Sequence, residues 1–129
     1  MSPQDQAAPG VRLERDGRVA RVAVGTGARR NALTSAGWAG VERMFRELAG
    51  HEQLRAVVLH GAGGTFSAGS DMREWAEADP AGVEESFARM EAACAAIEAL
   101  PVPVIAQVAG AAAGAGCQLA LACDLQVMA

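Results

Sequence analysis

The sequence contains no lysine, and all eleven of its basic residues are arginines. They are scattered between Arg12 and Arg89 with no run longer than Arg29-Arg30, and the formal net charge is −4. A surface that binds nucleic acid needs basic residues gathered on one face. The charge pattern therefore argues against a nucleic-acid partner.

Cysteine and long apolar runs are also scarce. The three cysteines, Cys94, Cys117 and Cys123, form no CxxC pair, so we expect three buried, reduced thiols. The longest apolar stretch, 102–125, is broken by proline, glycines and a glutamine, which argues against a membrane span. Residues 1–10 lack the apolar segment of a signal peptide, so we expect a flexible tail and a cytoplasmic protein.

Several catalytic and binding motifs are incomplete. Three GxG pairs occur, but arginine, phenylalanine or leucine stands where a dinucleotide-binding motif needs its third glycine, and no GK[ST] is present. Ser67 lies in a segment that misses GxSxG by one residue. His51 and His60 have no partners at metal-binding spacing. Nucleotide binding, serine hydrolysis and a metal site are therefore disfavoured.

The 129 residues suffice for one domain, which we expect to span residues 11–129 after the tail. Alternating residues around Asp16-Gly17 predict a hairpin, and Thr34, Asp71 and Pro80 are residue types that begin helices. Apolar runs predict buried strands at 54–60, 104–108 and 125–128, with helices at 35–49, 71–76, 80–100 and 116–122 between them. The alternation of strands and helices indicates an α/β fold with a parallel sheet.

Two small-residue loops stand out. Residues 66–71 (FSAGSD) and 114–119 (GAGCQL) each lead into a predicted helix and leave backbone N–H groups uncovered. Facing each other, they would form a two-donor site for a carbonyl oxygen that gains negative charge. The first loop alone is also explained as a turn between a strand and a helix, with Asp71 as the N-cap of that helix. The run 109–116 (AGAAAGAG) is harder to explain without a close approach of another backbone or a ligand.

These segments, with Arg30-Asn31-Ala32-Leu33, Leu100-Pro101 and the run 116–125 (GCQLALACDL), resemble the enoyl-CoA hydratase/isomerase (crotonase) superfamily from residue 11 to 129. The resemblance implies a spiral ββα fold and an acyl-CoA thioester ligand, with no separate cofactor and no metal. It also implies an oxyanion hole made by the backbone N–H groups of Ser70 and Ala115. It further implies that the remaining substrate-binding positions are Ala32, Leu33, Ala68, Gly69, Asp71 and Gly114.

Two departures from the family pattern matter. Gln118 stands where family hydratases carry a catalytic Glu, and the half of the fold that carries a second Glu follows residue 129 in the family order. An amide cannot exchange a proton near neutral pH, so isomerase-like chemistry is favoured over hydration. Two alternatives stay open, a catalytically silent acyl-CoA-binding module and one half of a split enzyme. When complete, the protein is expected to form a homo-oligomer (trimer or hexamer) or to pair with a second chain that supplies the C-terminal half.

Overall fold

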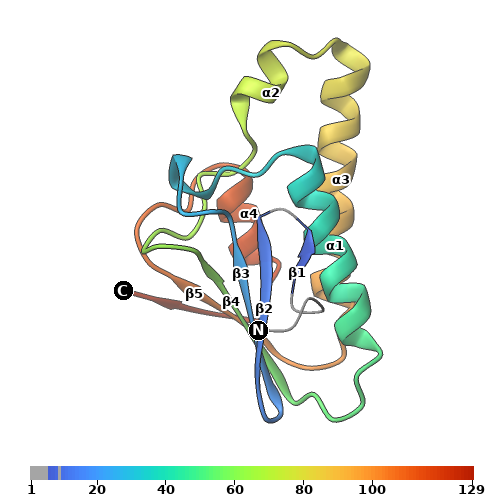
Figure 1. The fold of residues 1–129 in the computed structure, drawn as a ribbon, viewed down its shortest axis with the longest axis vertical. Helices are drawn as coiled ribbons and strands as arrows, with labels where there is room; N and C mark the ends of the chain where they lie inside the picture. The colour runs from blue at the N-terminus through green and yellow to red at the C-terminus, as the bar shows by residue number, and fades with distance from the viewer. Residues whose placement is uncertain (1–5, 9) are drawn as a thin grey trace.

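One mixed sheet organises the chain, with strands in the order β1-β2-β3-β4-β5-β6 (Figure 1). The computed structural model describes residues 6–8 and 10–129. The first three strands pair antiparallel and the others pair in parallel. Their bounds are Gln6–Ala8, Val11–Asp16, Val19–Val24, Ala56–Gly61, Val104–Val108 and Leu125–Met128.

The N-terminal hairpin confirms the turn predicted at Asp16-Gly17. Asp16 pairs with Val19, and Gly17 has a φ of 62°, a left-handed conformation that glycine adopts without a steric cost. Residues 1–10 were expected to form a flexible tail. Within them, Gln6–Ala8 instead form the short strand β1, which pairs with β2. The main-chain groups at the free edge of β2 explain this pairing. Residues 1–5 and 9 lie outside the described residues.

Four α-helices follow the sequence prediction to within one residue at each end. They are α1 (Ser35–Ala49), α2 (Met72–Ala76), α3 (Pro80–Ala99) and α4 (Ala115–Leu121). Side-chain caps begin three of them, from Thr34 to α1, from Asp71 to α2 and from Asp79 to α3. Among the described residues, no helix is long and apolar enough to cross a bilayer.

The core lies between the sheet and the helices α1 and α3, which pack side by side against the same face (Figure 1). Trp38 and Phe45 from α1 and Leu59 from β4 are fully buried. The sequence predicted that the strand at 54–60 is covered on both faces, but Val58 and His60 remain half-buried. Val57 and Leu59 are fully buried, whereas the residues that alternate with them stay partly accessible to solvent.

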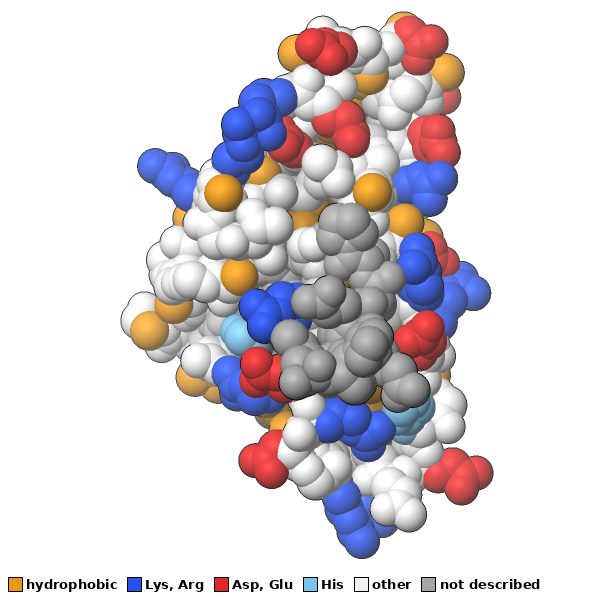
Figure 2. All heavy atoms as spheres, viewed as in Figure 1, with side chains coloured by type: hydrophobic (Ala, Val, Ile, Leu, Met, Phe, Trp, Pro, Cys, Tyr) orange, Lys and Arg blue, Asp and Glu red, His pale blue; other side chains and the backbone are white. Residues whose placement is uncertain are grey.

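The face of the molecule shown in Figure 2 carries charged side chains of both signs. On the face shown in Figure 2, the arginines are interspersed with acidic side chains from the top of the molecule to the bottom. This distribution agrees with the scattered positions of the basic residues in the sequence. The absence of a nucleic-acid partner stays a prediction.

The cysteines differ from the expectation of three buried thiols. Cys123 is buried, Cys94 is half-buried and Cys117 is exposed on α4. Burial, together with the nearby Asp124 carboxylate, raises the pKa of the Cys123 thiol to about 12. The apolar sequence around Cys117 did not reveal which side of its helix faces solvent.

Strand β6 also differs from its prediction as a buried strand. It lies at the edge of the sheet, where β5 is its neighbour among the described strands, and all four of its residues are exposed. Leu125, Val127 and Met128 are 58%, 59% and 71% exposed. An edge strand with exposed apolar side chains offers both free main-chain hydrogen-bonding groups and apolar area to another chain.

We therefore expect the 129-residue chain, studied alone, to self-associate through β6. Light scattering over a range of concentrations should show a rising mass, and Val127→Lys should reduce it because a charge on an edge strand opposes pairing. Gln53→Lys, which adds the same charge in an exposed loop, is the control. A monomer at all concentrations, with one sharp calorimetric transition, would contradict this prediction.

Candidate active site

The loops that follow β4 and β5 lie side by side, at the carboxyl ends of two adjacent parallel strands. Their backbones are hydrogen-bonded, from Phe66 N to Ala109 O at 2.8 Å and from Ser67 N to Ala111 O at 2.9 Å. A third bond returns from Ala113 N to Ser67 O at 3.2 Å. The two loops singled out in the sequence are thus brought together as one unit.

Glycine makes this close approach possible. A Cβ atom on Gly116 would overlap the carbonyl oxygen of Ser67, and a Cβ on Gly69 would lie 3.0 Å from the backbone nitrogen of Ala115. Gly69 also has a φ of 99°, which side chains rarely tolerate. The Ala/Gly run at 109–116 is therefore explained by backbone-to-backbone contact.

The pairing of Ser70 fixes the direction of its backbone. Leu33 pairs in parallel with Ser70, donating from its N to Gly69 O at 2.7 Å and accepting from Asp71 N at 2.9 Å. In such a pairing the middle residue turns its own N–H away from the partner strand. The Ser70 hydroxyl accepts a hydrogen bond from Trp38 Nε1 at 3.1 Å, which holds its side chain toward α1. The N–H group of Ser70 is thus left available on the other side.

Ala115 carries a second backbone N–H group at this place. It is the first residue of α4, and the N–H groups of a helix's first turn have no acceptor within the helix. Ala115 and Ser70 line the same pocket, whose volume is about 330 Å³. Ala68, Gly114 and Gln118 line it as well. The other predicted positions, Ala32, Leu33, Gly69 and Asp71, do not.

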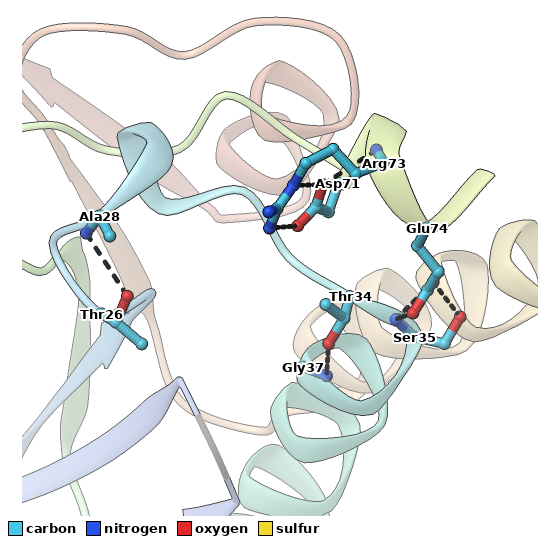
Figure 3. Close-up of polar contacts among 8 residues, drawn as sticks. All are labelled: Thr26, Ala28, Thr34, Ser35, Gly37, Asp71, Arg73 and Glu74. Atoms are coloured by element: carbon cyan, nitrogen blue, oxygen red, sulfur yellow. Dashed lines mark hydrogen bonds and ion pairs between the residues drawn. The ribbon is translucent and has the colours of Figure 1, made fainter. Parts of the chain in front are cut away.

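Asp71 is engaged in capping α2 (Figure 3). Its carboxylate accepts from the backbone nitrogen of Arg73 at 3.0 Å and pairs with the Arg73 guanidinium, also at 3.0 Å. The hydrogen bond from the Arg73 side chain is the main cause that lowers the pKa of Asp71. These contacts account for Asp71 structurally, and its substrate-binding role stays a prediction.

Gln118 lies on the exposed side of α4, at the wall of the pocket. Within the described part of the chain, its side chain makes no hydrogen bond. The amide can therefore hold a water molecule or a substrate oxygen, but it cannot take up a proton.

Sequence reasoning missed the structural role of Asn31. Its side chain is 1% exposed, and Nδ2 lies 2.8 Å from Ala62 O, 2.6 Å from Thr65 O and 3.2 Å from Phe66 O. Its Oδ1 accepts from Gly27 N at 2.8 Å. Asn31 therefore connects the loop after β4 with the segment that precedes α1 through hydrogen bonds.

Ser67 links the same two segments through a further hydrogen bond. Its buried hydroxyl donates to Asn31 O at 3.0 Å and accepts from Gly69 N at 3.0 Å. Arg29, Arg30 and Asn31 all have left-handed φ values, 55°, 54° and 59°. Such a run of non-glycine residues is strained and persists only where the surroundings hold it. The only sequence signal was the motif Arg30-Asn31-Ala32-Leu33, which carries the family resemblance.

We expect Asn31→Ala to destabilise the protein by at least about 3 kcal/mol, because several buried backbone groups each lose a partner at about 1–3 kcal/mol. Denaturant unfolding of the complete protein measures this change. Thr26→Ala, which removes only an exposed contact to Ala28 in the same loop, serves as the control (Figure 3). Equal stabilities for the two variants would contradict the role given to Asn31.

The described residues contain no group of three or more histidine, cysteine or acidic side chains able to hold a metal ion. The groups that the pocket itself offers to a ligand are backbone donors, one amide side chain and apolar walls.

Comparisons with known proteins identify the family and the fold. The family model described as enoyl-CoA hydratase/isomerase matches residues 14–129. The short-chain-enoyl-CoA hydratase of Clostridium acetobutylicum is 33% identical over 116 residues, covering 89% of this chain and 44% of that protein. The crystal structure of an enoyl-CoA hydratase from Mycobacterium smegmatis is 42% identical with a TM-score of 0.88, covering 93% of this chain and 48% of that one.

The chain belongs to the enoyl-CoA hydratase/isomerase family and has the N-terminal part of the crotonase fold. An enoyl-CoA hydratase from Bacillus anthracis, 27% identical with a TM-score of 0.88, is covered over 47% of its length. The chain thus spans about half the length of the relatives that it matches.

Proposed function

We propose that this chain forms the acyl-CoA-binding and enolate-stabilising part of an enzyme. The thioester carbonyl oxygen would accept hydrogen bonds from the backbone N–H groups of Ser70 and Ala115. The observation that carries the proposal is that these two residues, from two interlocked loops, line one pocket. Donors fixed in this way stabilise negative charge on the oxygen as the thioester becomes an enolate.

The favoured reaction is isomerase-like rather than hydration. Hydration needs one group to activate water and another to protonate the α-carbon, whereas moving a double bond needs a single proton-transfer group beside the oxyanion hole. Gln118 stands at the pocket and cannot transfer a proton near neutral pH. The proton would be moved by a carboxylate from the second half of the fold.

We propose that the complete protein is cytoplasmic. The second half of its fold would come either from further sequence of the same chain, which would then form a homo-oligomer, or from a second chain. The exposed apolar residues of β6 support a covering partner, because they offer an open sheet edge. A substrate that carries its own coenzyme A would require no separate cofactor.

The test is exchange of the α-protons of an acyl-CoA in deuterated water, followed by NMR, with the complete natural protein. The proposed function predicts exchange that depends on the protein, because exchange passes through the enolate. Binding of acyl-CoA by calorimetry without any exchange would instead indicate a catalytically silent module. Failure of acyl-CoA to bind would contradict both.

A further inference from the structure

The short helix α2 is held in place by two side chains that reach the two long helices. None of its five residues is buried, so it has no core contact of its own to fix it. Glu74 accepts from the backbone nitrogen of Ser35 at 3.0 Å and from its hydroxyl at 2.7 Å (Figure 3). Trp75 Nε1 donates to the Ser86 hydroxyl at 3.0 Å. Positions 74 and 75 thus tie α2 to α1 and α3.

The Trp75 indole is fixed on a second side by a ring contact. Its centroid lies 4.9 Å from that of Phe87, with the two rings tilted by 41°. Ser86, its hydrogen-bond partner, is 1% exposed on α3, so the indole is anchored to a well-packed position. A ring held by one hydrogen bond and one aromatic contact keeps a defined orientation.

Trp75 and Phe87 belong to the apolar wall of the pocket that Ser70 and Ala115 line. Met72, Trp75, Phe87 and Met90 belong to it, and Met72 and Phe87 are 64% and 44% exposed. Figure 1 shows α2 and the beginning of α3 standing away from the sheet. Large apolar side chains left open beside a pocket are matched by an apolar ligand.

Charge gives a second constraint on the ligand. Every described residue that lines this pocket is uncharged. A carboxylate at the far end of an acyl group would lose its hydration there without gaining a cationic partner, which is unfavourable. The wall therefore suits an uncharged hydrocarbon acyl group.

We propose that Trp75 determines acyl specificity: held on the apolar wall of the pocket by Ser86 and Phe87, its ring limits the length of an uncharged acyl chain. This inference rests on the proposed function, because it concerns the acyl group of the same thioester. Phe87 supports the ring, and Ser86 acts only through the indole.

The test measures the dissociation constants of saturated acyl-CoA thioesters of increasing length, and of one with a terminal carboxylate, with the complete natural protein. Affinity should rise with chain length to a limit and then fall, because one methylene too many costs about 10- to 200-fold in a fitted pocket. Trp75→Ala should move the limit to longer chains and relax the discrimination by about tenfold or more. The carboxylate-ended thioester should bind weakly to all variants.

Further variants separate positioning from general damage. Ser86→Ala should make the fall in affinity beyond the length limit less steep, while the affinity for the shortest thioester stays unchanged. Ser86→Thr, which keeps a hydroxyl, should restore the steep fall. Glu85→Gln, an exposed neighbour paired with Arg89, is the matched control. Trp75→Phe has a smaller ring and lacks the N–H that Ser86 accepts, so it should move the limit to slightly longer chains, which provides a second readout if the alanine variant folds poorly.

The outcomes distinguish this inference from the proposed function. If no acyl-CoA binds to the unsubstituted protein, the proposed function fails. If thioesters bind but the length limit is the same in Trp75→Ala, Trp75→Phe and the unsubstituted protein, Trp75 does not set it and the inference is wrong. Tight binding of the carboxylate-ended thioester would also overturn it.

Discussion

Replacing Ser70 by proline should lower the turnover of the complete enzyme by about 10²–10³-fold, the usual effect of losing one oxyanion-hole donor. Proline has no backbone N–H, so the substitution removes the donor that the pairing of Leu33 leaves free on Ser70. The measurement is the rate of α-proton exchange on an acyl-CoA. The substrate should still bind, because the N–H group of Ala115 and the apolar wall of the pocket remain.

Ser70→Ala is the matched control, because it keeps the N–H and removes only the hydroxyl that accepts from Trp38 Nε1. We expect this variant to retain most of the activity and to lose some stability, since the Trp38 indole N–H loses its partner. Full activity of the proline variant, or equal losses in both variants, would contradict the assignment of the Ser70 N–H.

Gln118→Glu should raise hydration of a short enoyl-CoA by about 10²–10⁴-fold, the usual contribution of general acid–base assistance. Gln118 already stands at the wall of the pocket, so the new carboxylate would have access to a water molecule there. The assay follows the loss of the absorbance of the conjugated thioester in the complete protein. The unsubstituted protein should hydrate the same substrate weakly or not at all.

Cys117→Glu provides the control for added charge on α4. Cys117 is exposed and adjacent to Gln118, but it does not line the pocket. We expect no gain in hydration from this variant. Rapid hydration by the unsubstituted protein that Gln118→Glu does not change would show that position 118 takes no part in proton transfer.

Local sequence patterns were sufficient for most of the elements of the fold. The Asp16-Gly17 turn and the caps Thr34 and Asp71 depend on a few neighbouring residues, and the structure confirms them. The exposure of β6 was not predictable in this way. An apolar strand indicates that something covers it, but not which segment does so.

The candidate site, too, could be predicted from local sequence patterns only in part. The small-residue loops predicted a two-donor site, because small residues before a helix are a local signal. The assignment of the donors to Ser70 and Ala115 came from the family resemblance. The roles of Asn31 and Trp75 depend on contacts between different segments of the chain, such as Asn31 with Thr65 and Trp75 with Ser86. Side-chain contacts of this kind become visible only when the chain is folded.

In the proposed function, the thioester oxygen lies between the N–H groups of Ser70 and Ala115. The carbonyl stretching frequency of an isotopically labelled acyl-CoA, measured on the complete protein by difference infrared spectroscopy, tests this claim most directly. Two hydrogen bonds to the oxygen weaken the carbonyl bond, so the frequency should fall on binding, fall equally in Ser70→Ala and fall less in Ser70→Pro. A bound thioester whose carbonyl frequency equals that in water, or a decrease that Ser70→Pro leaves intact, would contradict it.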